Sequence, residues 1–274
     1  MVTTGRRVCR SAGLFALCYA AGTFVEPLHA AIDENAATRG TSPAVAAASD
    51  LKFALEEIVA GFSRDTGIAV RVTYGSSGNF ARQIAQGAPY ELFLSADESF
   101  VMQLADRGLT LDRGTLYAIG RIALYAPNES PLVPDPRLRD LIRRVRDGRS
   151  GRIAIASPEH APYGRAAEQA LRSVGLWDAI APRLVLGENV AQAAQFAASG
   201  NADGGIIAYS LALAPPLRER GRFALLPESL HAPLRQRMAL TVRASSGAQR
   251  LYEYLQLPAA RAILERYGFA LPED

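Results

Sequence analysis

The sequence predicts an α/β fold of two units, each a mostly parallel sheet flanked by helices. Two observations predict it. Short apolar, β-branched stretches alternate with amphipathic helical patterns from Pro43 onward, and a second series of the same kind starts near Arg121. Such alternation is typical of parallel sheets, because a parallel strand pair needs a crossover connection. The tail after the second series could return to the first unit.

The first unit contains three strand–helix pairs. We expect strands at 44–48, 68–74 and 91–95. The first helix carries Leu51, Leu55, Ile58 and Phe62 on one face, and the second spans 80–86. The third is capped by Ser95 or Asp97 and ends at Gly108.

The second unit shows the same alternation. We expect strands at 121–127, 152–157 and 204–210, and helices at 164–174 and 190–199. The tail predicts one further strand, 236–242, and two helices separated by Pro258. The arginine-rich run 137–149 is interpreted as a solvated helix.

The first thirty residues predict an export signal. Arg6, Arg7 and Arg10 precede an apolar run of about 15 residues, shorter than the roughly 20 that a membrane-spanning helix needs, and cleavage is expected after Ala30. Both cysteines, Cys9 and Cys18, fall in this segment, so the mature chain has no thiol. We expect a signal peptide at 1–30, a flexible lead-in at 31–43, a first lobe at 44–120 plus 228–274, and a second lobe at 121–227.

The charge of the mature chain is nearly balanced. The whole chain has 30 basic and 27 acidic residues, and the predicted signal contains three of the basic residues and one of the acidic residues. The remainder carries a net charge of +1, and Lys52 is its only lysine. This balance gives no support to a nucleic-acid partner.

Four predicted helices begin with residues suited to anion binding. The stretch YGSSGNFARQIAQGAP (74–89) passes from a strand through a glycine-serine turn into a helix but lacks the lysine of a nucleotide-binding loop. Ser49 is expected to cap the first helix, Pro162 opens another and Asn189 can cap a fourth. Each start is common by itself. All four follow strand ends, where α/β proteins bind ligands, and unpaired N–H groups there attract anions.

Such donors can hold an anion without a cationic side chain. A hydrogen bond to a charged group contributes about 1.5–3 kcal/mol. About six of them could supply on the order of 10 kcal/mol after closure costs, which corresponds to nanomolar to micromolar dissociation constants. The sequence therefore predicts a small anion bound between the two units.

Four segments resemble the periplasmic molybdate-binding proteins of molybdate ABC transporters. They are AAASDLKFALEEI, YGSSGNFARQIAQGAPYELFLSAD, SPEHAPYGRAAEQAL and YLQLPAARAILERYGF, and the resemblance covers residues 44–270. It implies a two-lobed type II periplasmic binding protein fold with hinge crossings, near Gly120 and Leu226–Pro227. It also implies a periplasmic monomer with no cofactor, binding molybdate or tungstate and docking on an inner-membrane ABC permease with its ATPase.

The resemblance also assigns ligand groups. Ser49 and Ser77 fall on serines whose hydroxyl and N–H groups bind the oxygens of molybdate, and Asp50, Tyr163 and Val190 would contribute backbone N–H groups. Some relatives place a tyrosine hydroxyl on the ligand at the position of Ala208. Here Tyr209 comes one residue later and, by strand alternation, would point away.

Donors alone would also select among anions. Phosphate keeps a proton at neutral pH and needs an acceptor that such a site lacks, whereas sulfate differs from molybdate only in size. Molybdate and tungstate are nearly equal in size, so we expect little discrimination between them.

Two alternatives follow from the same residues. One is a binding protein for another small anion, such as sulfate or phosphate. The other is a serine hydrolase, but the turn 75–79 ends in Asn79 and lacks the final glycine of a nucleophile elbow. His160 could in principle orient on Glu159, but we interpret it as a loop-stabilising or exposed histidine, and we expect His231 at the surface. We therefore predict a binding protein and not an enzyme.

Overall fold

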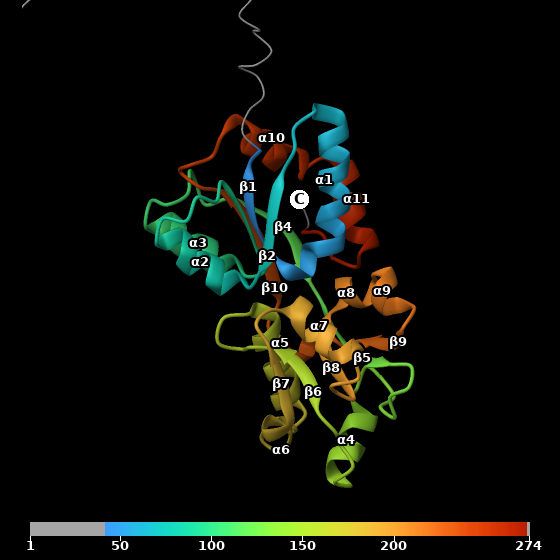
Figure 1. Cartoon of the computed structure of the whole chain (residues 1–274). Helices are drawn as coiled ribbons and strands as arrows, with labels where there is room; N and C mark the ends of the chain where they lie inside the picture. Colours follow the sequence, from blue (N-terminus) through green and yellow to red (C-terminus); the bar gives the residue numbers. More distant parts are fainter. Residues whose placement is uncertain (1–41, 273–274) are drawn as a thin grey trace, which may run out of the picture. The chain divides into compact units, whose positions relative to one another are not determined.

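The computed structural model describes residues 42–272, which belong to one compact unit. The predicted signal peptide and nearly all of the lead-in lie outside the described residues. Two five-stranded sheets with flanking helices make up the described part (Figure 1). Among these residues no helix combines the length and the apolar character that a bilayer crossing requires.

The first sheet has the strand order β2-β1-β3-β10-β4. In it β1 pairs in parallel with β2 and β3, whereas β10 pairs antiparallel with β3 and β4. Its strands are β1 (Ala44–Ala48), β2 (Arg71–Gly75), β3 (Leu92–Ser95), β4 (Thr115–Gly120) and β10 (Leu234–Leu240).

Helices cover both faces of this sheet (Figure 1). Because side chains alternate along a strand, Val45 and Ala47 pack into the core under the first helix, while Ala46 packs into the core on the other face. The helices of one face are α1 (Lys52–Thr66), α10 (Ser246–Tyr254) and α11 (Pro258–Arg266), and those of the other are α2 (Ser77–Ala85) and α3 (Glu98–Asp106).

The second sheet has the order β7-β6-β8-β5-β9 and forms one large core with its helices. Its strands are β5 (Ile122–Pro127), β6 (Ile153–Ala156), β7 (Leu184–Gly187), β8 (Gly204–Ala208) and β9 (Gly221–Leu225). Its helices are α4 (Arg139–Arg146), α5 (Pro162–Ser173), α6 (Trp177–Ile180), α7 (Val190–Ala198), α8 (Tyr209–Leu213) and α9 (Pro215–Arg218).

The chain passes between the sheets twice. One residue separates the end of β4 at Gly120 from the start of β5 at Ile122, and a longer segment joins β9 to β10. Two sheets joined by short crossings make the fold two-lobed: the lobe of β1–β4 and β10, and the lobe of β5–β9. The residue boundaries that we predicted for the lobes remain an interpretation of this topology.

Tyr209 corrects one of the sequence arguments. The strand β8 ends at Ala208, and Tyr209 begins helix α8 instead of continuing the strand, so alternation cannot be applied to it. Its ring packs edge-on against Phe223 at 5.9 Å and beneath the guanidinium of Arg121 at 5.0 Å. Strands β4, β7 and β9 were not predicted either.

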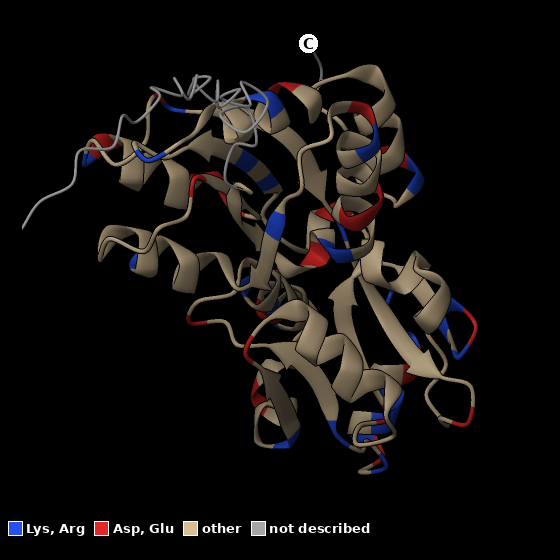
Figure 2. Ribbon diagram, turned by 45° about the horizontal axis from the view of Figure 1, so that its top comes forward, with Lys and Arg blue, Asp and Glu red and all other residues tan. Residues whose placement is uncertain are grey.

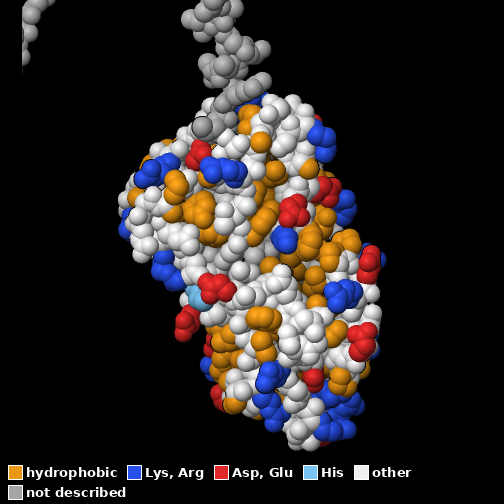
Figure 3. All heavy atoms as spheres, in the orientation of Figure 1, with side chains coloured by type: hydrophobic (Ala, Val, Ile, Leu, Met, Phe, Trp, Pro, Cys, Tyr) orange, Lys and Arg blue, Asp and Glu red, His pale blue; other side chains and the backbone are white. Residues whose placement is uncertain are grey.

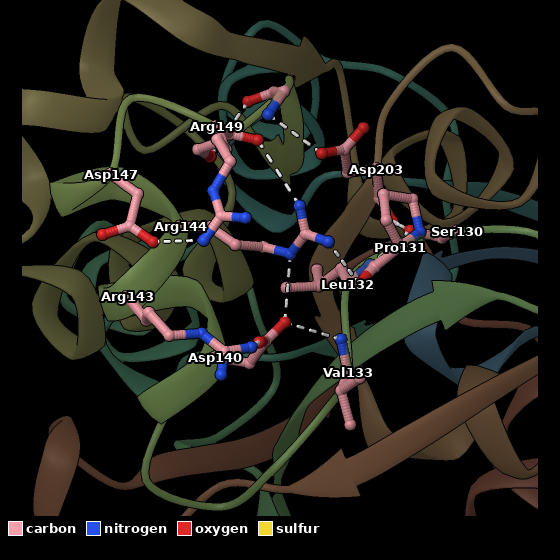
Figure 4. Close-up of polar contacts among 12 residues, drawn as sticks. Ser130, Pro131, Leu132, Val133, Asp140, Arg143, Arg144, Asp147, Arg149 and Asp203 are labelled. Atoms are coloured by element: carbon pink, nitrogen blue, oxygen red, sulfur yellow. Dashed lines mark hydrogen bonds and ion pairs between the residues drawn. The ribbon is translucent and has the colours of Figure 1, made fainter.

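The arginine-rich helix α4 is only partly solvated, contrary to the prediction. Leu138, Leu141 and Asp140 are buried. The Asp140 carboxylate accepts hydrogen bonds from the Val133 N–H (2.9 Å) and Arg144 Nε (3.1 Å), and Figure 4 shows it between these two donors. The helix is therefore held to the segment before it by one buried acid.

Replacing this acid should destabilise the second lobe. Asp140→Ala leaves the Val133 N–H and the largely buried Arg144 guanidinium without their acceptor, which costs about 1–3 kcal/mol of unfolding free energy. Urea denaturation measures this loss. Asp147→Ala is the matched control, because Asp147 is paired with the exposed Arg149 and should change stability by less than about 0.5 kcal/mol. Equal effects of the two substitutions would contradict this account of the helix.

Candidate functional site

A small cavity lies where strands of the first lobe end and helices of both lobes begin. The cavity is small, about 10 Å³, which is close to the minimum that one enclosed water molecule needs. Its lining comes from both lobes: Ala48, Ser49, Asp50, Gly75, Ser76, Ser77, Ala96, Ala161, Pro162, Tyr163, Asn189 and Val190.

All five residues predicted from the resemblance line this cavity. Ser49 and Asp50 belong to the short 3₁₀ turn Ser49–Leu51 before α1, Ser77 begins α2, Tyr163 is the second residue of α5, and Val190 begins α7. The first N–H groups of a helix have no acceptor within the helix, and they carry the positive end of its dipole. The structure thus brings together the donors that an anion needs; their role as ligands stays a prediction.

The serines differ from the expected capping pattern. Ala48, not Ser49, is the N-cap of the first turn, and the Ser49 hydroxyl oxygen accepts the N–H of Ala191 (3.2 Å) from the other lobe. The Ser77 hydroxyl oxygen accepts the N–H of Ala96 (2.9 Å), while the buried Ser76 hydroxyl has no partner. Asn189 caps α7 as predicted.

The side chain of Asp50 makes contacts that we did not predict. It is 1% exposed, and its Oδ2 accepts hydrogen bonds from the Tyr163 hydroxyl (2.9 Å) and from Gln236 Nε2 (2.6 Å). Its Oδ1 is buried without a partner. Asp50 therefore lines the cavity while its carboxylate contacts Tyr163 and Gln236, and the expectation of a site without an acceptor stays a prediction.

Burial raises the pKa of Asp50 from 3.8 to about 6. The hydrogen bonds from Gln236 and Tyr163, and the nearby N–H groups of Asp50 and Leu51, favour the ionised form but offset only part of that effect. The sequence analysis assigned only the backbone N–H of Asp50. An acid that directly follows an apolar strand was the feature from which a buried carboxylate could have been predicted.

Direct contacts hold the two lobes together around the cavity. The N–H of Gly78 donates to the carbonyl oxygen of His160 (3.0 Å), Arg165 pairs with Asp97, and Asn79 bonds to Glu188. The structure therefore shows the closed arrangement of the lobes.

Of the two histidines, His160 contacts a neighbouring loop, in line with one of its two interpretations, whereas His231 lies differently from what we predicted. His160 Nε2 lies 3.0 Å from the carbonyl oxygen of Glu188 and 3.3 Å from its carboxylate, not on Glu159. His231 is 9% exposed and its Nδ1 lies 2.7 Å from the carbonyl oxygen of Ala232, so it is not at the surface. Neither histidine lines the cavity.

No lysine or arginine lines the cavity, and residues 42–272 contain no group of three or more His, Cys, Asp or Glu side chains suited to a metal ion. Figure 2 shows the charged residues scattered over the helices and loops of both lobes. A larger groove of about 450 Å³ includes Phe53 and Leu211, near where Figure 3 shows apolar side chains between α1 and α8. It does not include any of the five predicted residues.

Comparisons with known proteins place these features in context. Residues 43–270 match the family of bacterial extracellular solute-binding proteins. The chain is 34% identical over 227 residues to the molybdate-binding protein ModA of Rhodobacter capsulatus, covering 82% of this chain and 86% of that protein. Its structure resembles the periplasmic molybdate-binding protein of Azotobacter vinelandii with a TM-score of 0.76 at 31% identity, covering 85% and 100% of the two chains.

A third similarity concerns the fold alone. The sulfate-binding protein SubI from Mycobacterium tuberculosis H37Rv superimposes with a TM-score of 0.68 at 15% identity, covering 85% of this chain and 88% of that one.

The raised pKa of Asp50 predicts a pH-dependent stability difference. The folded state binds more protons than the unfolded state between pH 4 and 6, so ionisation of Asp50 lowers stability as pH rises through that window. Asp50→Asn removes this effect, and its stability relative to the unmodified protein should be greater at pH 8 than at pH 4 by about 3 kcal/mol. Urea denaturation at both pH values measures the difference. Asp106→Asn, in an exposed ion pair, serves as control, and a pH-independent difference for Asp50→Asn would contradict the prediction.

Proposed function

The chain belongs to the bacterial extracellular solute-binding proteins, and on that premise we propose that it binds molybdate between its lobes in the periplasm and delivers it to an ABC permease. Members of this family bind and deliver solutes and are not enzymes. The proposed partners are the oxyanion and an inner-membrane permease with its ATPase, and the proposed carrier is a monomer without a cofactor.

One observation carries the proposal: four helix starts from two lobes converge on one small cavity. The backbone N–H groups of Asp50, Ser77, Tyr163 and Val190, with the hydroxyls of Ser49 and Ser77, are the proposed donors to the molybdate oxygens. Each donor to a charged acceptor contributes about 1.5–3 kcal/mol, so several together can hold a dianion without a cation.

Size and shape support an oxyanion over an organic solute. Tungstate has nearly the same dimensions as molybdate, and we propose that it binds comparably. Sulfate remains the second candidate, because a sulfate-binding protein has the same fold. A cavity built for the larger anion would discriminate against sulfate by stretching several hydrogen bonds at once.

Closure of the lobes is proposed to follow from ligand bridging. Donors of the first lobe (Ser49, Asp50, Ser77) and of the second (Tyr163, Val190) can act on one ion only when the lobes are closed. A ligand that binds the closed form better shifts the population toward it. The crossing at Gly120 and the segment between Leu225 and Leu234 are the places where the chain can bend.

Calorimetry with molybdate, tungstate, sulfate and phosphate tests the ligand directly. We expect tight binding of the first two and a dissociation constant in the nanomolar to micromolar range. Ser77→Ala should weaken molybdate binding about 5- to 150-fold, because a donor to the anion is lost. Ser76→Ala is the matched comparison and should cost less. A larger loss at Ser76 would transfer the proposed contact to that hydroxyl, and tight binding of sulfate alone would contradict the proposal.

A substitution at Gly78 tests whether binding needs closure. A Cβ at Gly78 would lie 2.7 Å from the carbonyl oxygen of His160 in the other lobe, so Gly78→Ala obstructs the closed arrangement without touching the ligand groups. We expect molybdate affinity to fall at least tenfold while thermal stability without ligand stays close to that of the unmodified protein. Gly247→Ala is the control, since its Cβ would meet only ordinary contacts at 3.5 Å and beyond. Unchanged affinity in Gly78→Ala would exclude closure as a requirement.

A further inference from the structure

Asp50 presents an unusual combination of features for a residue of an anion cavity. Its side chain is completely enclosed, one carboxylate oxygen accepts two hydrogen bonds, and the other oxygen has no partner. A buried acceptor without a donor costs about 1–3 kcal/mol or more when it is charged, so a proton or a donor on Oδ1 would be stabilising.

The groups around this carboxylate supply no positive charge. Tyr163 of α5 and Gln236 of β10 contact Oδ2, and Tyr117 of β4 donates to Gln236 Oε1 (2.7 Å). Burial raises the pKa of both tyrosines well above 10, so they stay neutral.

No charged side chain of the remaining described elements neutralises Asp50, although the backbone N–H groups of Asp50 and Leu51 favour its ionised form. From α8, Ser210 donates to the backbone carbonyl oxygen of Asp50 and not to its carboxylate. From α7, the residues at the cavity are Asn189 and Val190. The ammonium of Lys52, at the start of α1, lies over the ring of Phe53 at 5.7 Å, and no ion pair recorded within residues 42–272 involves Asp50.

A dianion and an ionised Asp50 cannot share this enclosed space cheaply. Two unit charges 4 Å apart interact by about 4 kcal/mol at an effective dielectric constant of 20, and a dianion roughly doubles this repulsion. An adjacent negative charge also favours protonation of a carboxyl group. One additional proton removes the repulsion and gives Oδ1 a hydrogen to donate.

We infer that the site takes up one proton from solvent with each proton-free dianion, and that this proton lies between Asp50 Oδ1 and a ligand oxygen. The inference deepens the proposed molybdate binding and rests on it. Asp50 then acts as a further side-chain donor in the complex, although it is an acid, and it makes affinity depend on pH.

The same carboxylate affects which oxyanions are accepted. Hydrogen phosphate and hydrogen arsenate bring their own proton and can donate it to ionised Asp50 without any uptake from solvent. Asp50 therefore makes the site tolerant of protonated tetrahedral anions, at some cost in selectivity for molybdate at high pH. Asparagine at this position would remove the negative charge and keep a donor group.

Proton counting by calorimetry tests this inference. Molybdate is titrated into the mature protein at pH 8 in buffers of different ionisation enthalpy, and the dependence of the apparent enthalpy on the buffer gives the protons taken up per anion. We expect a value near one. Affinity should fall by about tenfold per pH unit between pH 7 and 8.5, as one linked proton requires. Phosphate at pH 8 should bind with an uptake near zero.

Two variants separate a linked proton from a merely structural role of Asp50. In Asp50→Asn, proton uptake with molybdate should vanish and affinity should no longer vary with pH, while phosphate binding at pH 8 should weaken about 5- to 150-fold through loss of the acceptor. Tyr163→Phe removes one donor to Oδ2, so the pKa of Asp50 in the free protein should rise further and the decline in affinity should begin at higher pH. Asp97→Asn, which removes a charge paired with Arg165 outside the cavity lining, is the control and should keep the proton uptake.

The outcomes distinguish this inference from the proposed function. Tight molybdate binding without proton uptake, or the same pH dependence in Asp50→Asn, overturns the role of Asp50 and leaves the proposed function intact. If sulfate binds and molybdate does not, the proposed function fails. The number of protons taken up is then measured with sulfate, which is also a proton-free dianion, and this number tests the role of Asp50. If no dianion binds at any pH, both fail.

Discussion

The need to enclose an anion without an opposing cation constrains the whole arrangement. A single helix start supplies only a few N–H groups and about half a unit of positive charge, which is too little to replace the hydration of a dianion. Four starts can act on one ion only if strands of both lobes end at the same place. The strands β1 and β2 of the first lobe and β6 and β7 of the second satisfy this condition, since each leads into a helical segment whose first residues line the cavity.

The inferred role of Asp50 would mean that such a site need not consist of donors alone. An acid at the wall would lower affinity when ionised and contribute a donor when protonated, so its effect on binding would depend on pH and on the ligand. The neutral Tyr163 and Gln236 hold one of its oxygens in place and leave the other without a partner. The backbone N–H of Tyr163 is a proposed donor to the anion, and the hydroxyl of the same residue donates to the Asp50 carboxylate.

The sequence predicted those parts of the fold that local pattern determines. The strand β1, the cap at Asn189 and the break at Pro258 follow from side-chain periodicity and backbone chemistry. The strands β4, β7 and β9 were missed; all three lie at sheet edges, where apolar alternation is weak.

The site was harder to predict in its side-chain details than in its location. Helix starts and the resemblance brought Ser49, Ser77 and Val190 to one cavity correctly, because their backbone positions depend on the fold. The acceptor role of Ser49 toward Ala191 and the buried pairing of Asp50 with Gln236 depend on residues more than 140 positions apart. The first contact exists only after the two lobes meet, and the second only after β10 has joined the sheet of the first lobe, so a single sequence carries no local signal for either.

A crystal structure of the mature protein loaded with molybdate tests the central claim most directly. The account predicts one ion in the cavity, with its oxygens within hydrogen-bonding distance of N–H groups from both lobes and with no lysine or arginine in contact. An ion paired to an arginine, or bound by groups of one lobe only, would contradict it.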